Sequence, residues 1–412
     1  MKIVFPSIMN NSNMYASFAE ELEQLRARGQ FRQLGRIERR DCVHADFNDA
    51  RFLNLSSNDY LGIGGNQGFL EEFLRQDAPE HLLDRFGMSS SSSRLLTGNH
   101  RAYDLLEQAL INMYHSEAAC VFNSGYHANI GILSALADRR DVIFSDKLNH
   151  ASIVDGMKLS EARFFRYRHC DYAHLEELLA QHRHEYRRAF IVSESVFSMD
   201  GDLADVRRLA ELKRAHDALL IVDEAHAVGV FGQTGCGVGE EVGVMPEIDV
   251  IVGGFGKACA SLGGFAITNR LLKDYLVNTM RPLIFTTALP PIVLNWSRFA
   301  LQKIAGMQAQ RAHLRALSER FRQALRACGL RTDGASQIIP ILIGDNLQTV
   351  NLSEQLRQRG WLIFAIRPPT VPPNTARLRL SLNAEMTWEQ LAPLPRQVAE
   401  ILHEMGNSAA SA

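Results

Sequence analysis

The stretch that decides the fold is "DVIVGGFGKACASLGGFAITN", residues 249–269. It holds two short apolar runs, 249–254 and 263–269, on either side of a glycine-rich segment that carries one lysine, Lys257. Short runs rich in Val, Ile and Phe and bounded by glycine are typical of strands. A lysine directly after a buried strand needs a reason, because burial removes water from its ammonium group.

The same alternation extends on both sides of this stretch. We predict seven strands, at 118–122, 141–146, 162–167, 189–195, 218–224, 249–254 and 263–269. Helical patterns separate most of them, and "VRRLAELKRAHD" (206–217) places Leu209, Leu212 and Ala215 at helical spacing. Strands that alternate with amphipathic helices are typical of βα units. The sequence therefore predicts an α/β fold with a mainly parallel seven-stranded sheet.

Beyond residue 296 the pattern becomes a long helix and then a smaller αβ region. We predict an N-terminal segment over 1–55, a large domain over 56–300, a smaller C-terminal α/β domain over 301–405 and a flexible tail over 406–412. A chain of 412 residues is long enough for such a division.

The composition, with 46% hydrophobic and 22% charged residues, is that of a globular protein. A net charge of −2 argues against nucleic acid as the main partner. The six cysteines form no CxxC pair and no short metal-ligand spacing, so we expect neither a disulfide framework nor a metal site. The first residues lack the apolar run of a secretory signal, and no window has the length of a membrane span. We expect a cytoplasmic protein.

Polar and small residues follow several predicted strands, where ligands of open α/β sheets gather. They are Ser124, Gly125 and Tyr126 after the first strand, His150 after the second, and Asp223 and His226 in "VDEAHAVG". Each has two interpretations. The first group could bind a phosphate at a helix N-terminus or be an ordinary helix cap. A single histidine or aspartate after a strand is usually structural.

The letters "DEAH" at 223–226 also occur in nucleotide-driven motors. A phosphate-binding loop of that class requires GxxxxGK followed by Ser or Thr. Here Ile251 stands in place of the first glycine and Ala258 follows the lysine. The sequence therefore excludes this type of nucleotide pocket.

A lysine, an aspartate, histidines and a phosphate-binding turn at converging strand ends describe a pyridoxal 5'-phosphate site. A buried lysine of lowered pKa can form a Schiff base with an aldehyde. An aspartate keeps the pyridine nitrogen protonated, so that the ring accepts electrons, and a histidine can stack on the ring. We therefore expect this cofactor at Lys257, Asp223 and His150.

Over nearly its whole length the chain resembles the α-oxoamine synthases, which are fold-type I pyridoxal-phosphate enzymes with an aspartate-aminotransferase-like fold. The motifs that carry the resemblance are "LNLSSNDYLG", "SSSRLLTGNH", "FNSGYHAN", "DKLNHASI", "SVFSMDGD", "VDEAHAVGVFGQTGCG" and "FGK". Residues 365–387 are most similar to members that join L-alanine to a pimeloyl thioester in biotin synthesis. The resemblance implies a decarboxylating Claisen condensation, with coenzyme A or an acyl-carrier protein as the thiol carrier.

The resemblance also implies a role for each matching residue. Lys257, Asp223 and His150 would be catalytic. The cofactor would be bound by Ser124, Gly125, Tyr126, His150, Ser198, Asp223, His226, Lys257, Thr286 and Thr287, and the substrate by Arg32, His150, Thr370 and Arg379. Arg36 or Arg39 could take the place of Arg32. The segment with Thr286 and Thr287 reaches the phosphate across a dimer interface in the family, which implies a homodimer.

Two other functions fit the same resemblance. One is a sibling synthase that uses glycine, serine or another acyl thioester, and the other is a non-catalytic partner subunit with the same fold. The presence of Lys257, Asp223 and His150 argues against the second. One residue departs from the family pattern: Gly254 stands where the family usually has a threonine or serine that contacts the phosphate.

Overall fold

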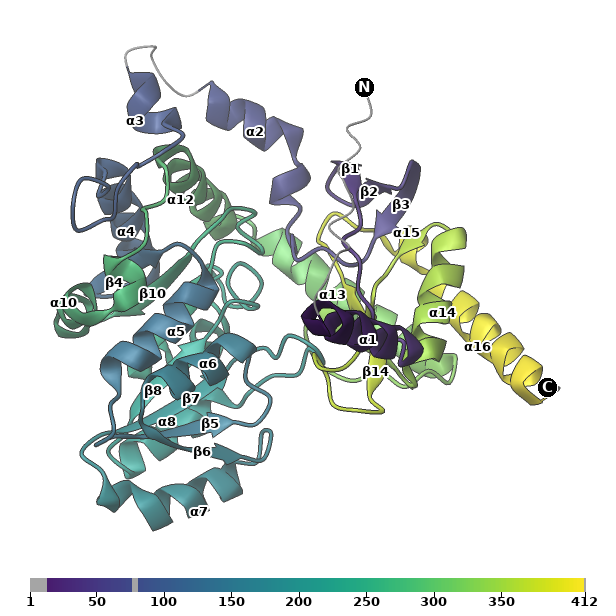
Figure 1. The fold of residues 1–412 in the computed structure, drawn as a ribbon. Helices are drawn as coiled ribbons and strands as arrows, with labels where there is room; N and C mark the ends of the chain where they lie inside the picture. Colours follow the sequence, from purple (N-terminus) through teal and green to yellow (C-terminus); the bar gives the residue numbers. More distant parts are fainter. Residues whose placement is uncertain (1–12, 76–80, 411–412) are drawn as a thin grey trace.

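The computed structural model describes residues 13–75 and 81–410. The chain forms a large part, built on a seven-stranded sheet, and a smaller part that holds the C-terminal third (Figure 1). The long helix α13 (Gln308–Ala327) lies in the smaller part, and α12 (Pro291–Ala305) covers the large part before it.

All seven predicted strands form one sheet in the order β4-β10-β9-β8-β7-β5-β6. Their bounds are β4 (Ala118–Phe122), β5 (Val142–Asp146), β6 (Arg163–Tyr167), β7 (Ala189–Glu194), β8 (Leu219–Asp223), β9 (Val250–Gly254) and β10 (Gly264–Thr268). The pairs among β6, β5, β7, β8 and β9 are parallel, whereas β10 runs antiparallel to β9 and β4. The predicted α/β fold with a mainly parallel sheet is confirmed.

Helices cover both faces of this sheet. The helices of the large part are α2 (Gln67–Leu74), α3 (Leu82–Phe86), α4 (Arg101–Tyr114), α5 (Gly125–Leu136), α6 (Ala151–Leu159), α7 (Tyr172–His182), α8 (Val206–Ala215), α9 (Val238–Glu241), α10 (Arg270–Thr279), α11 (Arg281–Ile284) and α12, of which α2 and α3 lie away from the sheet (Figure 1). Side chains of β4 alternate between two apolar clusters: Val121 belongs to the cluster that contains residues of α4 and α8, and Phe122 to the one that contains residues of α5 and α6. In α8, Leu209 and Leu212 are buried as predicted, but the last residue, Ala215, is exposed.

The smaller part contains segments from both ends of the chain. Strands β11 (Ile338–Gly344), β14 (Ala376–Ser381) and β13 (Ala365–Ile366) form one sheet, and β1 (Ile37–Arg40), β2 (His44–Phe47), β3 (Ala50–Asn54) and β12 (Trp361–Leu362) form another. Strand β3 pairs in parallel with β12, with Leu53 opposite Trp361. Helices α14 (Asn346–Gln358), α15 (Trp388–Leu391) and α16 (Leu394–Ala410) pack in this part. The N-terminal segment is therefore built into the smaller part.

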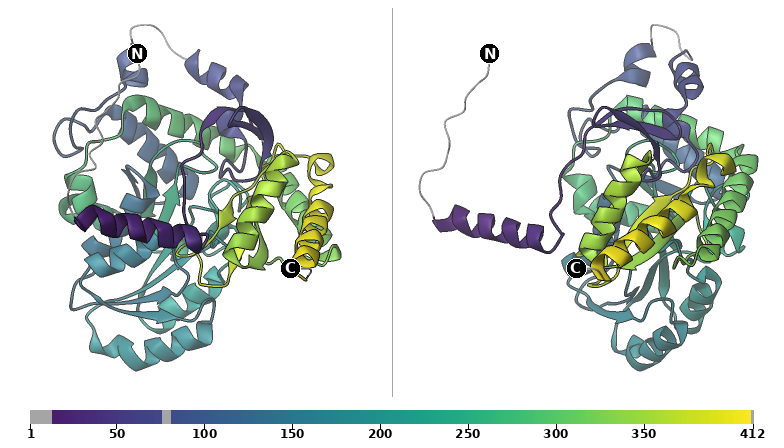
Figure 2. Two further views of the ribbon diagram at one scale, coloured as in Figure 1. Left: turned by 45° about the vertical axis from the view of Figure 1, so that its right-hand side comes forward. Right: turned by 90° about the vertical axis from the view of Figure 1, so that its right-hand side faces the viewer.

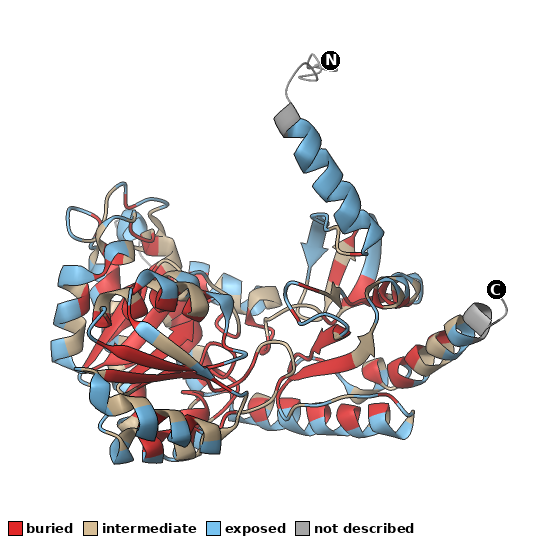
Figure 3. Ribbon diagram, turned by 60° about the horizontal axis from the view of Figure 1, so that its bottom comes forward, coloured by how far each residue is buried: buried red, intermediate tan, exposed pale blue. Residues whose placement is uncertain are grey.

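Helix α1 (Asn13–Ala27) projects from the body of the molecule (Figure 2, right). Its described side chains are exposed, while the strands of the large sheet are almost wholly buried (Figure 3).

The domain boundary near residue 300 stays a prediction. The predicted tail over 406–412 begins inside α16, and its last two residues lie outside the described residues, as do residues 1–12 of the predicted N-terminal segment. In the part of the chain that the structure describes, no helix is long and apolar enough to cross a membrane.

Two adjacent glycines of β9 give a test of sheet packing. A β-carbon at Gly253 would lie 2.1 Å from Cζ of Phe265 on the neighbouring strand, whereas one at Gly254 would lie 3.5 Å from Cβ of Ala225. We expect Gly253→Ala to lower the free energy of unfolding by about 1–3 kcal/mol through overpacking. Gly254→Ala, the matched control, should change it by less than ~1 kcal/mol. Urea denaturation of both variants measures this difference, and equal stabilities would contradict the packing described.

Candidate active site

A cavity of about 250 Å³ lies at the carboxyl ends of the large-sheet strands. Its wall contains seven of the predicted site residues: Ser124, Gly125, Tyr126, His150, Asp223, His226 and Lys257. A larger surface hollow of about 630 Å³, between residues 230–241 and α13, contains none of them. The strand-end positions named from the sequence therefore meet at one place.

Lys257 follows β9 after a turn, and its backbone carbonyl accepts a hydrogen bond from the N–H of Ala260 (2.8 Å). Burial of the amine lowers the pKa of Lys257 to about 8, although the carboxylates of Asp223 and Glu194 oppose this shift. A substantial fraction of the amine is then neutral near pH 8. A neutral amine is the form that attacks an aldehyde.

Asp223, the last residue of β8, is buried, and both its carboxylate oxygens accept hydrogen bonds. Oδ2 accepts from Nδ2 of Asn129 (2.7 Å), and Oδ1 accepts from the backbone N–H of Ala225 (2.8 Å). Asn129 also donates to Oγ of Ser152 (3.0 Å), which bonds Nδ1 of His150 (2.8 Å). This chain of hydrogen bonds fixes the orientation of the Asp223 carboxylate relative to the His150 ring.

The two predicted histidines have different surroundings. His150 caps α6 and lines the cavity. Partial loss of water around its ring lowers its pKa, while Asp223 raises it. His226 is buried, and its Nδ1 lies 2.7 Å from the hydroxyl of Tyr60. Burial and the nearby Lys257 lower the pKa of His226 well below its usual range. His226 is therefore a neutral ring that can hydrogen-bond without adding charge.

The start of α5 offers backbone N–H groups to the cavity. Ser124 caps the helix, because its Oγ accepts from the N–H of His127 (3.0 Å). The first α5 backbone bond to Ser124 comes from Ala128, so the N–H groups of Gly125 and Tyr126 precede it. A β-carbon at Gly125 would meet nothing within 4 Å. Ser124 is therefore the helix cap that the sequence allowed, and the open space beside Gly125 also suits an anion at the helix N-terminus.

Arg379 and Ser198 lie next to the cavity and not in its wall. Arg379 on β14 is buried, and its guanidinium contacts Oδ1 of Asn58 (3.3 Å), a residue of the cavity wall. Its Nε donates to the backbone carbonyl of Ser198 (2.5 Å). This contact of Ser198 is made by its main chain, whereas its role in cofactor binding, which the resemblance implied, stays a prediction.

Four predicted residues lie outside this cavity. Arg32 and Thr370, both exposed, are brought together, since Nη2 of Arg32 donates to Oγ1 of Thr370 (3.2 Å). Arg36, the alternative to Arg32, pairs with Glu38 instead. Thr286 and Thr287 are also outside it, and the carbonyl of Thr287 accepts from Nδ2 of Asn123 (2.7 Å).

The sequence did not single out Asn129, Ser152, Glu194, Asn58 and Tyr60, although all of them contact the site or line it. Asn129 had a usable signal, because it lies four residues after Gly125 and so on the same helix face. Glu194 could also have been found, because a carboxylate at the end of a predicted strand is a candidate site residue, and Glu194 is the last residue of β7. Among the described residues, its buried Oε1 has no hydrogen-bond partner.

The residues of the cavity fit pyridoxal phosphate. The cavity combines an amine of lowered pKa, a fixed carboxylate for the ring nitrogen, helix N–H groups for a phosphate, and the buried, unpartnered oxygen of Glu194. Gly254 also lines it, with room for a larger side chain.

The chain is similar to known proteins over most of its length. Residues 50–397 match the model of the family "Aminotransferase class I and II". The chain is 51% identical over 376 residues to 8-amino-7-oxononanoate synthase of Chlorobaculum parvum, which covers 91% of this chain and 96% of that protein. A serine palmitoyltransferase from S. paucimobilis, solved with a bound PLP–myriocin aldimine, matches at a TM-score of 0.88 and 28% identity, covering 96% of this chain and 100% of that one.

A solved 8-amino-7-oxononanoate synthase from Francisella tularensis matches at a TM-score of 0.73 and 26% identity, covering 86% of this chain and 98% of that one. The fold-type I architecture and the dependence on pyridoxal phosphate expected from the sequence are thereby confirmed. The chain belongs to the class I and II aminotransferases and, among them, to the family of 8-amino-7-oxononanoate synthases.

Proposed function

We propose that the chain is an acyltransferase that joins L-alanine to a pimeloyl thioester, with release of carbon dioxide and the free thiol, to give 8-amino-7-oxononanoate for biotin synthesis. The observation that carries this proposal is the Lys257 amine of lowered pKa, facing the fixed Asp223 carboxylate across one cavity. The identity of 51% with a synthase of this name supports the choice of substrates.

When bound, pyridoxal phosphate supplies an aldehyde and a ring that stabilises negative charge on the substrate carbon. Lys257 would hold the aldehyde carbon and, once released by the incoming amino acid, would move the α-proton of L-alanine. Its lowered pKa suits both tasks, because the amine must be neutral to accept a proton near physiological pH.

Asp223 would face the ring nitrogen and keep it protonated. Its two hydrogen bonds, from Asn129 and Ala225, stop the carboxylate from rotating away. His150 would stack on the ring and help to place the acyl group, and His226 would hydrogen-bond the ring hydroxyl. Because His226 is neutral, it would make this bond without adding a positive charge that the Asp223 carboxylate would also attract.

The phosphate would lie at the start of α5, on the N–H groups of Gly125 and Tyr126. Thr286 and Thr287 lie outside the cavity of their own chain. We propose that they reach the phosphate in a second copy, which makes the working form a homodimer with shared sites. The exposed apolar residues Tyr15, Phe18 and Leu22 of α1 suit contact with such a copy.

Arg379 would bind the carboxylate of L-alanine, because a guanidinium presents two parallel donors that match a carboxylate. Arg32 and Thr370, which contact one another, would act farther out along the acyl substrate. Serine palmitoyltransferases share the fold at 28–32% identity, but the higher identity to synthases of the alanine type favours alanine over glycine or serine.

The reaction itself is the first prediction of this proposal. Purified protein with pyridoxal phosphate, L-alanine and pimeloyl-CoA or pimeloyl-acyl-carrier protein should yield the mass of 8-amino-7-oxononanoate. Running both carriers in parallel identifies the acyl carrier. Glycine and L-serine are the competing amino acids in the same assay. Product with one of these and none with L-alanine would transfer the assignment to a sibling synthase.

Lys257→Ala tests the proposed catalytic lysine. Turnover should fall at least ~100-fold, since a general acid–base group typically contributes that much. The cofactor should still bind, without a covalent link: after borohydride reduction, denaturation and filtration, the parent should retain the absorbance of the cofactor and Lys257→Ala should not. Lys158→Ala, at an exposed lysine of α6, is the matched control and should keep its activity. Undiminished turnover of Lys257→Ala would refute the role.

The pKa of Lys257 predicts how cofactor uptake depends on pH. Only the neutral amine reacts with the aldehyde, and its fraction grows as the pH rises through the pKa of about 8. Covalent uptake of pyridoxal phosphate by cofactor-free protein should therefore accelerate between about pH 6.5 and 8.5 and then level off. Stopped-flow absorbance measures this rate. A profile that keeps rising to pH 10.5 would show an amine with an ordinary pKa.

A further inference from the structure

The loop Phe197–Asp202 bridges the two parts of the molecule. It follows β7 and is closed at its base by a bridge between Val196 and Leu203. Within the loop, the N–H of Phe197 donates to the carbonyl of Asp202 (3.0 Å), and the N–H of Gly201 donates to the carbonyl of Phe197 (3.0 Å). The loop is therefore a compact turn held together by its own backbone hydrogen bonds.

One side of this loop contacts the smaller part. The carbonyl of Ser198 accepts from Nε of Arg379 (2.5 Å), and Asp200 forms an ion pair with Arg377. The two arginines lie on β14. The carbonyl of Gly201 accepts from the N–H groups of Ala335 (2.9 Å) and Ser336 (3.1 Å). The loop thus holds the Nε end of the Arg379 guanidinium, while Nη1 donates to Oγ of Ser381 (2.8 Å) on β14 itself.

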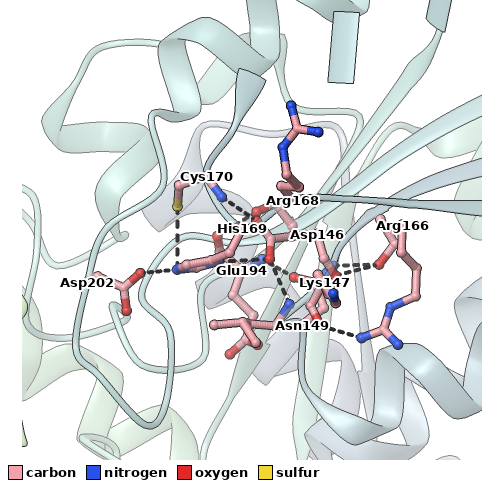
Figure 4. A network of polar contacts seen from close by, with 12 residues as sticks. Asp146, Lys147, Asn149, Arg166, Arg168, His169, Cys170, Glu194 and Asp202 are labelled. Carbon is pink, nitrogen blue, oxygen red and sulfur yellow. Dashed lines mark hydrogen bonds and ion pairs between the residues drawn. The ribbon is translucent and has the colours of Figure 1, made fainter. Parts of the chain in front are cut away.

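The other side is held by His169, which follows β6 (Figure 4). Its Nε2 lies 2.5 Å from Oδ2 of Asp202, in the loop, and its Nδ1 lies 2.9 Å from Oδ1 of Asp146, the buried last residue of β5. The ring also meets the edge of Phe197, with ring centres 4.4 Å apart. His169 therefore joins the loop to the large sheet.

The Asp146 end of this link is fixed by the backbone. Its Oδ1 also accepts from the N–H of Leu148 (2.8 Å), and its Oδ2 accepts from the N–H of Cys170 (2.9 Å). The groups that face the imidazole are the two carboxylates and the Cys170 thiol, whose Sγ lies 3.7 Å from Nε2. The hydrogen bonds to the two carboxylates raise the pKa of His169 to about 12, against the effect of burial. The ring is a cation with both N–H groups donating.

Asp146, His169 and Cys170 also place three possible metal-ligand atoms within 4.8 Å of one another. A metal would need a deprotonated ring nitrogen, but both ring nitrogens already face carboxylates. The protonated, doubly bonded ring is the arrangement that the structure supports.

We propose that His169 is a positioning residue: it fixes the loop Phe197–Asp202, so that the Ser198 carbonyl orients Arg379 toward the cavity. This inference rests on the proposed role of Arg379 in binding the carboxylate of the amino acid. Among the described residues, the carboxylates that His169 hydrogen-bonds are those of Asp146 and Asp202, and it bonds neither Lys257 nor Asp223. Its loss should therefore weaken amino-acid binding and leave the later chemical steps intact.

The test compares His169→Gln with Arg379→Lys and with the control His184→Gln, at an exposed histidine. We expect the KM for L-alanine of His169→Gln to rise roughly tenfold, the equivalent of one hydrogen bond. Its kcat and its KM for the pimeloyl thioester should stay within about threefold of the parent values. Asp202→Asn, which alters the same link from the loop side, should shift the same constant in the same direction.

Hydrogen exchange on the cofactor-free protein gives a readout independent of turnover. In His169→Gln, the bonded amides of Gly201, Ala335 and Ser336 should exchange faster than in the parent and in His184→Gln. Unchanged exchange would overturn the inference even if no product were formed in any assay. If Arg379→Lys raises the KM for L-alanine and neither His169→Gln nor Asp202→Asn does, the inference fails alone. If Arg379→Lys leaves the KM for L-alanine unchanged, both the proposed carboxylate-binding role of Arg379 and the inference on His169 fail.

Discussion

The removal of water from the Lys257 amine is the constraint on which the site depends. A charged amine at the end of a buried strand is costly, and two carboxylates, of Asp223 and Glu194, partly offset the cost. The balance leaves an amine that ionises near pH 8. It also requires a sheet edge where three strands, β7, β8 and β9, end side by side. The parallel order of these strands is therefore what gives Lys257 its chemistry.

The sequence predicted the large sheet well because every strand except β6 is a short apolar run in which nearly every residue is buried. It could not predict that β3 pairs with β12, since β12 has only two residues and its partner lies about 300 positions away. Patterns within a window of the chain carry no information on such a pair. The boundary proposed for the N-terminal segment followed the chain, whereas the packing joins that segment to the C-terminal part.

A similar limit applies to the site. Lys257, Asp223 and His150 could be named because their side chains are distinctive and follow predicted strands. The contact between Ser198 and Arg379 could not be predicted, because the atom of Ser198 that makes it is a backbone carbonyl, which every residue has. Asn129 and Ser152 were missed for another reason: they act on Asp223 and His150 from helices α5 and α6, and only the helix packing brings them together. Residue type reveals the reacting groups better than it reveals their supports.

The pairing of β3 with β12 also affects the order in which the two parts of the chain can fold during synthesis. During synthesis, residues 118–269 can complete the large sheet as soon as they emerge, because every strand of that sheet lies within this range. The smaller part must wait for residue 362, since its N-terminal strands have their parallel partner only then. Until that point the apolar side chains of Leu53 and Phe52 remain without Trp361 and Leu362. Arg379, on β14, is also synthesised after every strand of the large sheet, so the strand end that carries Lys257 can form before Arg379 reaches its place beside the cavity.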